Sequence, residues 1–536
     1  METAVLTEEQ QQQSLIKRLC IFFTMIYAIQ GLSQGGISGL FYLPLSFMLK
    51  DKMNFTPEQL AYFRGLVMVP WAVKPLYGLL SDFVPILGYR RRSWLIVAAT
   101  TATSAALYLA KFCNFSFDQL LFFLIATAFG IAFCDVLCDA VMVENGKKFN
   151  MTDKFQAIQW RAISCSSIAA GLVSGLIAKY FTYGQMFLLM AFLPSLVFIA
   201  AIFFVPEKRY QYKDSKKTTE VKSISKARDW IIVLIVNLII VLLLLKLNSR
   251  YLEMETLHFL LLFGPALILA SLTYVLRRAL NKKIIFCILF LFWWDFSLAL
   301  GGTPFFYYKT EALGFSKVFM GLLGTLGSAG GFFGAWFFMK ISRKRIFWGE
   351  KPLIELSLEK MLFYSLFVGI ATILSSFLVV GAKSAMVLDI SFGFIFMFSH
   401  LTILVLAAKF CPPQIEGTFF ALLMSVINLG ASISERVSGM LYKFLHSAAS
   451  PELANNIPAQ VLVWIGWPTQ WAVKKPTEGI NLFGLYYAAF WLIIMSLGAF
   501  CFYFFAIRRF GESIKEEKEL EVLNISKLFS ENNKNK

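Results

Sequence analysis

The chain has little charge, few histidines and no cysteine spacing that indicates a metal site. Only 15% of its 536 residues are Asp, Glu, Lys or Arg, and it has three histidines. Its eight cysteines form no Cys-x-x-Cys pair, so we expect neither a disulfide framework nor a zinc site, and no cofactor. The sequence also lacks a Gly-x-x-x-x-Gly-Lys-Ser/Thr phosphate loop and a His-Glu-x-x-His motif, which argues against an enzyme.

Apolar residues are abundant instead. They make up 58% of the chain, which includes 56 Phe, and a water-soluble domain could not bury that much apolar surface. Residues 1–14 are polar, and no cleavable signal peptide is expected before the first long apolar segment. We therefore expect a polytopic membrane protein in contact with the lipid bilayer, whose first spanning helix acts as the insertion signal.

The formal net charge of +17 could suggest a nucleic-acid partner. The basic residues, however, cluster in alternate connections between apolar segments, for example at 90–92, 208–228 and 343–345. The positive-inside rule explains this pattern without nucleic acid and places both termini in the cytoplasm. We expect a monomer in a plasma membrane or a bacterial inner membrane.

A membrane-spanning helix needs about 20 mainly apolar residues. Fourteen segments meet this requirement, at 19–47, 58–82, 93–112, 117–143, 156–180, 184–205, 230–247, 257–276, 284–308, 316–340, 360–381, 385–408, 414–445 and 482–507. The predicted fold is an all-α polytopic membrane protein with two six-helix halves and an inserted central helix pair. The predicted parts are a cytoplasmic N-terminus (1–18), a first half (19–206), a basic linker with two extra helices (207–283), a second half (284–508) and a cytoplasmic tail (509–536).

The two halves show weak internal similarity. Asn54-Phe55-Thr56, before the second span, resembles Gly314-Phe315-Ser316, before its counterpart in the second half. Thr56 followed by Gln59 is also a capping-box arrangement, which is typical of a helix start. The extra pair at 230–247 and 257–276 is rich in Leu, Ile and Val, and we interpret it as peripheral helices without a role in substrate binding.

Polar residues inside the first half are candidates for a central site, because an ionisable group at bilayer depth must face protein, water or a partner. Gln30 and Gln34 flank glycines in the first span and predict either a polar cavity wall or close helix packing. Asp135 and Asp139 lie one turn apart in the fourth span. They could carry a proton or form a structural ion pair, and Arg161 is the basic partner that the sequence suggests.

Further candidates lie in the second and seventh spans. Lys74 could bind an anionic substrate, reach toward the interface or pair with a fourth-span acid. Asp295 lies ~17 Å along its helix at 1.5 Å per residue, near mid-bilayer, and is our leading candidate for proton coupling and substrate binding. Trp294 beside it could form a flat wall for a planar heterocycle or simply pack, and Asn428 is a further substrate-binding candidate.

A charged motif covers the end of the second span and the connection that follows it. Its sequence, Lys-Pro-Leu-Tyr-Gly-Leu-Leu-Ser-Asp, runs from position 74 to 82 and is followed by Gly88-Tyr89 and three arginines. An acid at the end of one helix and a basic cluster at the start of the next predict a charged latch at the mouth of a transporter. The expected gating residues are Gly78, Asp82, Arg90, Arg91, Arg92 and Arg161.

This motif resembles the signature between the second and third helices of the major facilitator superfamily. Its exact residues are similar to those of the folate-biopterin transporter family. Similar blocks are the Asp-x-x-x-Asp-Ala-x-x-Val-Glu run at 135–144, Trp294-Asp295, and Cys-Pro-Pro-Gln-Ile-Glu-Gly-Thr at 411–418. The resemblance implies a major facilitator fold and a secondary transporter of pteridines such as folate and biopterin, and we expect alternating access with coupling to protons. The alternatives are transport of an adenosyl compound, a nucleotide or an amino acid, and a transport-dead sensor or assembly protein.

Overall fold

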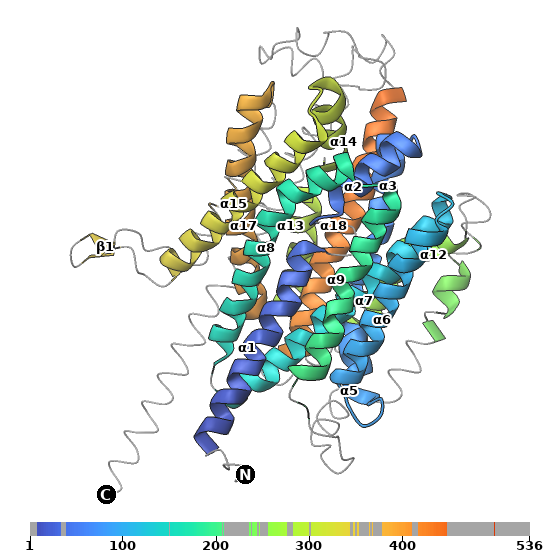
Figure 1. The fold of residues 1–536 in the computed structure, drawn as a ribbon. Helices are drawn as coiled ribbons and strands as arrows, with labels where there is room; N and C mark the ends of the chain where they lie inside the picture. The colour runs from blue at the N-terminus through green and yellow to red at the C-terminus, as the bar shows by residue number, and fades with distance from the viewer. Residues whose placement is uncertain are drawn as a thin grey trace, which may run out of the picture.

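The computed structural model is a bundle of long helices that run in alternating directions (Figure 1). It describes most of the first half and selected parts of the second. The described residues are 8–33, 39–149, 151–205, 256–275, 282–299, 302–342, 378–409 and 416–447, with a few isolated positions and short pieces between and beyond these ranges.

The first half begins with helix α1 and ends with helix α9. They are α1 (Glu8–Leu32), α2 (Tyr42–Phe47), the π-helix η1 (Met48–Lys52), α3 (Pro57–Val67), α4 (Val69–Ala72), α5 (Lys74–Phe83), α6 (Arg92–Phe112), α7 (Phe117–Phe149), α8 (Thr152–Tyr180) and α9 (Tyr183–Phe203). The predicted capping box is confirmed: Thr56 and Gln59 exchange side-chain-to-backbone hydrogen bonds of 3.0 and 3.2 Å. A second capping box, Thr182 with Gln185, starts α9.

The later elements run from α12 to α18. They are α12 (Thr256–Val275), α13 (Lys282–Ala299), α14 (Gly302–Tyr307), the π-helix η5 (Tyr308–Ala312), α15 (Lys317–Ser342), the two-residue strands β1 (Phe347–Trp348) and β2 (Lys351–Pro352), α17 (Ala382–Lys409) and α18 (Glu416–Ser447). Within the described ranges, nine segments are long and apolar enough to cross a membrane. The protein is therefore a multi-pass membrane protein. Half of the predicted span at 230–247 and most of those at 360–381 and 482–507 lie outside the described residues.

The second predicted span, 58–82, is not one continuous helix. It is divided into α3, α4 and α5, with breaks next to Pro70 and Pro75. Proline has no N–H to donate and its ring clashes with the preceding turn, so each proline interrupts the helical ladder and frees a carbonyl. One freed carbonyl, that of Trp71, accepts a hydrogen bond of 3.0 Å from Asn428 Nδ2 in α18.

The similarity between the halves is reproduced in the backbone. α2 and η1 recur as α14 and η5, with every boundary 260 residues further along the chain. A residue with positive φ follows each π-helix, at Asn54 and at Gly314. The next residue in each half, Phe55 and Phe315, donates its N–H across the turn at 3.0 Å. The predicted match between 54–56 and 314–316 is thus confirmed.

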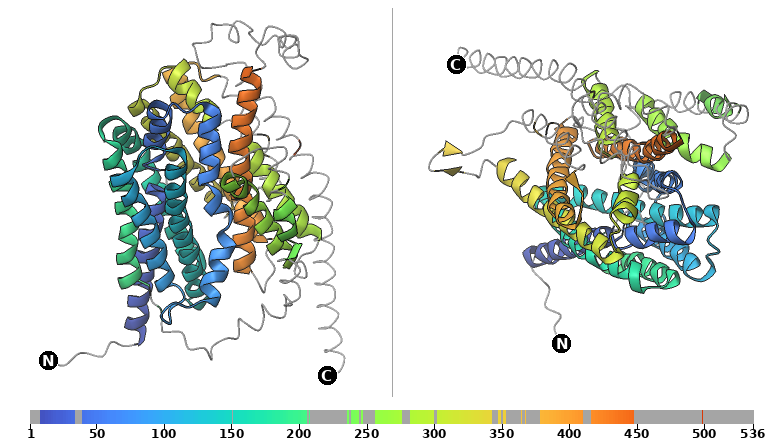
Figure 2. Two further views of the ribbon diagram at one scale, coloured as in Figure 1. Left: turned by 90° about the vertical axis from the view of Figure 1, so that its right-hand side faces the viewer. Right: turned by 90° about the horizontal axis from the view of Figure 1, so that it is seen from above.

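The two halves meet along two seams (Figure 2). In one, α8 crosses α15 so closely that a Cβ on Gly175 would lie 2.6 Å from the carbonyl oxygen of Lys317. In the other, α18 lies along α3, α4 and α5, and a Cβ on Gly439 would lie 2.8 Å from that of Ala61. Small residues therefore allow the halves to touch through their backbones, as is usual where helices pack inside a membrane.

Candidate functional site

A buried polar network lies between helices of the first half. At its centre is Asp135 in α7, whose Oδ1 accepts a hydrogen bond of 2.7 Å from Gln30 Nε2 in α1. Its other oxygen, Oδ2, forms an ion pair of 2.6 Å with Lys74 Nζ at the start of α5. The Lys74 ammonium also lies 4.6 Å from the ring centre of Trp71, so both an anion and an aromatic face hold this cation.

The second acid of α7 continues the network one turn further on. Asp139 Oδ1 accepts a hydrogen bond of 2.6 Å from the hydroxyl of Tyr27 in α1 and a longer one of 3.4 Å from Gln159 Nε2 in α8. These two donors are neutral, whereas Asp135 has a cationic partner. The arrangement thus contains one charge-compensated carboxylate and one carboxylate held only by neutral hydrogen-bond donors.

The structure identifies the basic partner of the acids as Lys74 rather than Arg161. Of the predicted roles for Lys74, pairing with a fourth-span acid is confirmed. Arg161, the partner chosen from the sequence, lies exposed on α8. A similar depth in the membrane favoured Arg161, but the start of α5 brings Lys74 to within bonding distance of Asp135. Gln34, the other first-span amide, lies outside the described residues.

Two members of the network were not chosen from the sequence as site residues. Tyr27 precedes Gln30 by three positions, so both lie on the same face of α1. Gln159, only 1% exposed, faces Asp139 and the Cys138 sulfur at 3.7 Å. A search for polar side chains one helical turn from a predicted site residue would have found Tyr27.

Of the second-half candidates, Asn428 reaches the edge of this network through its 3.0 Å hydrogen bond to the Trp71 carbonyl, whereas among the described residues Asp295 and Trp294 make no hydrogen bond to it. Asp295 is partly buried in α13, and its Cβ lies 3.6 Å from the position of a Cβ on Gly430 of α18. In the part of the chain that the structure describes, Asp295 has no hydrogen-bond or ion-pair partner. Trp294 is 2% exposed and packs against Phe290 at 5.7 Å between ring centres, an environment that fits the packing alternative.

The predicted latch forms as an ion-pair cluster. Arg91 Nη2 contacts Asp82 Oδ1 at 2.5 Å and Glu144 Oε1 at 2.8 Å. Burial lowers the pKa of Arg91, but these two carboxylates raise it more, so the pKa lies above its ordinary value. All three residues belong to the first half, so the cluster ties the end of α5 to α6 and α7 and does not bridge the two halves.

The remaining latch residues have different environments. The backbone N–H groups of Arg90 and Arg92 donate to the Glu207 carboxylate at 2.7 and 2.9 Å, which places an anion at the N-terminus of α6. Arg92 also lies over the Tyr89 ring at 5.9 Å. A Cβ on Gly78 would be 3.8 Å from the nearest atom, an ordinary contact, so packing does not require glycine there.

Ion pairs between the halves are found on the opposite side of the bundle from the start of α1, and sequence analysis did not predict them. Lys50 pairs with Glu311 at 3.1 Å, and Lys317 pairs with Asp51 at 3.0 Å. Deeper in the same region, Arg64 lies 3.7 Å from Glu435, and its Nη1 donates to Thr303 at 2.9 Å. We call these three ion pairs the inter-half lock. Its residues come from η1, α3, η5, α15 and α18.

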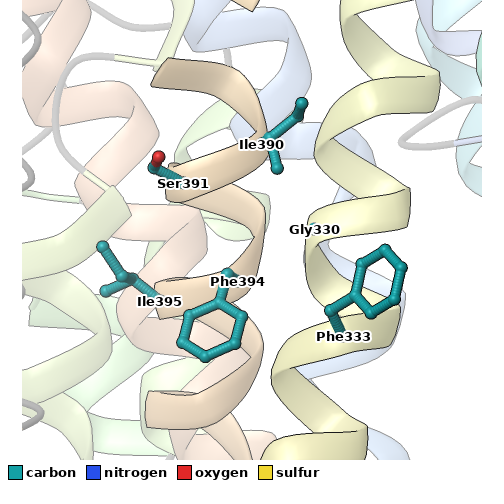
Figure 3. Close-up of a pocket in the computed structure, with 6 residues that line it drawn as sticks. All are labelled: Gly330, Phe333, Ile390, Ser391, Phe394 and Ile395. Carbon is teal, nitrogen blue, oxygen red and sulfur yellow. The ribbon is translucent and has the colours of Figure 1, made fainter. Parts of the chain in front are cut away.

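A hollow of about 370 Å³ between α15 and α17 contains none of the predicted site residues. Figure 3 shows its lining, which is mainly apolar: Gly330, Phe333, Ile390, Ser391, Phe394 and Ile395. Phe333 is 57% exposed, so this hollow opens on the outer surface of the bundle. The polar network, and not this hollow, is the candidate functional site.

Residues 34–463 match the BT1 family. The chain belongs to the BT1 family. This membership confirms the resemblance to the folate-biopterin transporter family. One relative, the folate-biopterin transporter of Synechocystis sp., is 27% identical to this chain over 434 residues, which cover 78% of this chain and 74% of the relative. Folate transporter 1 of Plasmodium falciparum is 23% identical over 80% of this chain and 74% of its own length.

The fold of this BT1 family member is that of the major facilitator transporters. The crystal structure of a POT family transporter in complex with a thioalcohol-conjugated peptide matches it with a TM-score of 0.60. That match covers 90% of this chain and 95% of the solved one, at 13% sequence identity. The likeness establishes the architecture of two helical halves, whereas the polar network described above is a property of this chain's own residues.

Proposed function

We propose that this BT1 family member is a secondary transporter that moves pteridines of the folate and biopterin type by alternating access between its two halves. The observation that carries the proposal is the buried polar network around Asp135 and Asp139, placed inside a bundle that belongs to a family of transporters. Two relatives are named as transporters of folate or of folate and biopterin, which gives the substrate class.

The chemistry of the network suits a planar heterocycle. A pterin ring offers N–H donors and ring-nitrogen and carbonyl acceptors along its edges, and a site selects such a molecule by matching them. Asp139 and the side chains of Gln30 and Gln159 provide acceptors and donors, and the Tyr27 hydroxyl provides both. In this proposal the ring displaces the weaker contacts of the network, such as the 3.4 Å bond from Gln159 to Asp139.

Alternating access requires two closed states, one on each side of the membrane. The inter-half lock supports the assignment of this structure to a state closed on the side away from the start of α1. With both termini in the cytoplasm, as the distribution of basic residues favours, that side is the external one. We propose the division into halves at 19–206 and 284–508, and a plasma or bacterial inner membrane location, on the same basis.

Proton coupling is the finer part of the proposal. Asp135 and Asp139 are one turn apart, so a proton on either relieves the repulsion between them. Asp295 supports coupling for a different reason, because within the described ranges it has no partner to neutralise its charge. A carboxylate without a partner inside a membrane bundle is a functional candidate by default.

Uptake of radiolabelled folate and biopterin into membrane vesicles, with and without an imposed pH gradient, tests the proposal. Wild-type protein should accumulate both compounds, and adenosyl compounds, nucleotides or amino acids should not compete. Asp295→Asn should abolish accumulation driven by the gradient while exchange persists. Asp118→Asn, at an exposed acid in the first turn of α7, is the matched control and should behave as wild type.

Two outcomes would contradict the proposal. If wild type takes up neither pteridine, the substrate class is wrong, and direct uptake of a radiolabelled adenosyl compound, nucleotide or amino acid would identify the class that replaces it. If the gradient still drives accumulation in Asp295→Asn, Asp295 is not the coupling group.

A further inference from the structure

Arg436 in α18 is a buried cation at the seam between the two halves. Its side chain is 4% exposed and lies against the backbone of α3, where a Cβ on Gly65 would come within 2.5 Å of Arg436 Cγ. The Nη2 group donates to the Gly65 carbonyl at 2.9 Å and to Ser432 Oγ at 3.2 Å. Among the described residues, therefore, only Nη2 of the guanidinium has hydrogen-bond partners.

The other two nitrogens of Arg436 have no acceptor within the described part of the chain. Neither Nε nor Nη1 has a hydrogen-bond partner among the described residues, although both are buried. The adjacent acid, Glu435, does not neutralise the guanidinium because it is engaged with Arg64 and Thr303. A buried charge without an anion is strongly unfavourable, and so are buried donors without acceptors.

Other cations of the described bundle lie at a similar depth or are similarly buried, but unlike Arg436 they are paired with an acid. Each of those has a carboxylate at ion-pair distance: Lys74 has Asp135, Arg64 has Glu435 and Lys309 has Asp389. The stabilisation that these cations receive from an acid is missing at Arg436. The unfavourable arrangement therefore calls for a partner that is not a described part of the chain.

We propose that Arg436 binds the anionic group of the substrate, a carboxylate, through the unused Nε and Nη1 donors when α3 and α18 separate. This inference rests on the proposed function, because it names the part of a folate-type substrate that this site holds. The planar guanidinium matches a carboxylate with two parallel hydrogen bonds. The seam joins the two halves. The movement that opens the inter-half lock during alternating access therefore also exposes the guanidinium of Arg436.

Lys74 is the other cation that could take this role, but its charge is compensated by Asp135 at 2.6 Å. A substrate carboxylate at Lys74 would have to compete with that acid, whereas at Arg436 it would meet an uncompensated charge. The two sites together would hold a folate-type molecule by its ring at the network and by its tail at the seam. A substrate without a carboxylate would use the network alone.

Comparison of folate, which has carboxylates, with biopterin, which has none, tests the inference. In Arg436→Gln, the apparent KM for folate should rise about tenfold or more, the usual effect of losing hydrogen bonds to a charged group. The KM for biopterin should change less than twofold. The tail fragment p-aminobenzoylglutamate should inhibit folate uptake by wild type and lose its effect in the variant. Asp118→Asn, the exposed control in the first turn of α7, should keep the wild-type ratio of folate to biopterin uptake.

The controls separate this inference from the proposed function. Failure of wild type to transport either pteridine would contradict the proposed function, whereas equal losses for folate and biopterin in Arg436→Gln would overturn the role of Arg436 alone. If Arg436→Gln does not reach the membrane, Arg436→Lys decides, because it keeps the charge and loses the planar fork. A larger loss for folate than for biopterin in Arg436→Lys supports the inference, and equal losses contradict it.

Discussion

Removal of the Lys74 charge should destabilise the protein more than removal of its partner's charge. In Lys74→Met, Asp135 keeps only the hydrogen bond from Gln30. Breaking a buried ion pair by deleting one member costs about 3–5 kcal/mol. The side chains of Lys74 and Asp135 are 14% and 8% exposed, so solvent screens part of the charge and we expect a loss near the lower end, ~3 kcal/mol.

The opposite single substitution should cost less. In Asp135→Asn, the Lys74 ammonium still lies over the Trp71 ring at 4.6 Å, and a desolvated cation–π contact contributes about 2 kcal/mol. The double variant Lys74→Met with Asp135→Asn leaves no unpaired charge and should be more stable than Lys74→Met alone. The expected order of loss is therefore Lys74→Met, then Asp135→Asn, then the double variant, with a coupling energy of roughly 2 kcal/mol.

Thermal unfolding of the purified protein in one detergent, at one heating rate, measures this order. A fixed rate is needed because membrane proteins often unfold irreversibly, so that the midpoint depends on the scan. Additive effects of the two substitutions would show that Lys74 and Asp135 do not act as a pair. Uptake supplies a second readout: Lys74→Met should lower folate and biopterin transport by the same factor, because the network holds the ring that both share. A loss confined to folate would place the substrate tail at Lys74 and refute this reasoning.

Two further predictions concern the charged clusters at the ends of the bundle. Asp82→Asn should lower the turnover of transport moderately while leaving the protein inserted, because Arg91 keeps Glu144 at 2.8 Å; unchanged transport rates in that variant would contradict a latch. Asp51→Lys should weaken the inter-half lock by placing two like charges together, and a partly exposed pair of this kind is worth at most about 1 kcal/mol, or roughly fivefold in the population of the closed state. Adding Lys317→Asp restores opposite charges, so the double variant should recover wild-type uptake, and failure to recover would show that the lock does not depend on this pair.

Local features of the fold could be predicted from the sequence. The capping box at Thr56 and Gln59 needs only residues three positions apart, and the pairing of Asp82 with the arginine cluster needs a connection of fewer than ten residues. The repeat of 54–56 at 314–316 was visible because the same turn requires positive φ in both halves, which Asn and Gly tolerate best. In each case the chemistry and the geometry are set within one or two helical turns.

Contacts between distant segments could not be predicted in the same way. The choice of Arg161 as partner of Asp135 and Asp139 relied on a similar depth in the membrane, but depth does not fix which helix face a side chain occupies. The break between α4 and α5 near Pro75 determines where Lys74 lies, and its position relative to α7 depends on the whole bundle. The inter-half lock joins residues more than 200 positions apart, so no local pattern indicates it.

The asymmetry of the lock shows how the two halves have come to differ while keeping one backbone. Lys50 contacts both Thr310, its own counterpart at the 260-residue offset, and Glu311, the counterpart of Asp51. A strict two-fold relation would require a lysine at position 310 to pair with Asp51, but the chain has threonine there. Lys317 supplies the missing charge from the start of α15. Because the two pairs use different positions, opening the halves breaks ion pairs of unequal exposure. The more exposed pair, Asp51 with Lys317, should be weakened more by added salt than the pair of Lys50 with Glu311.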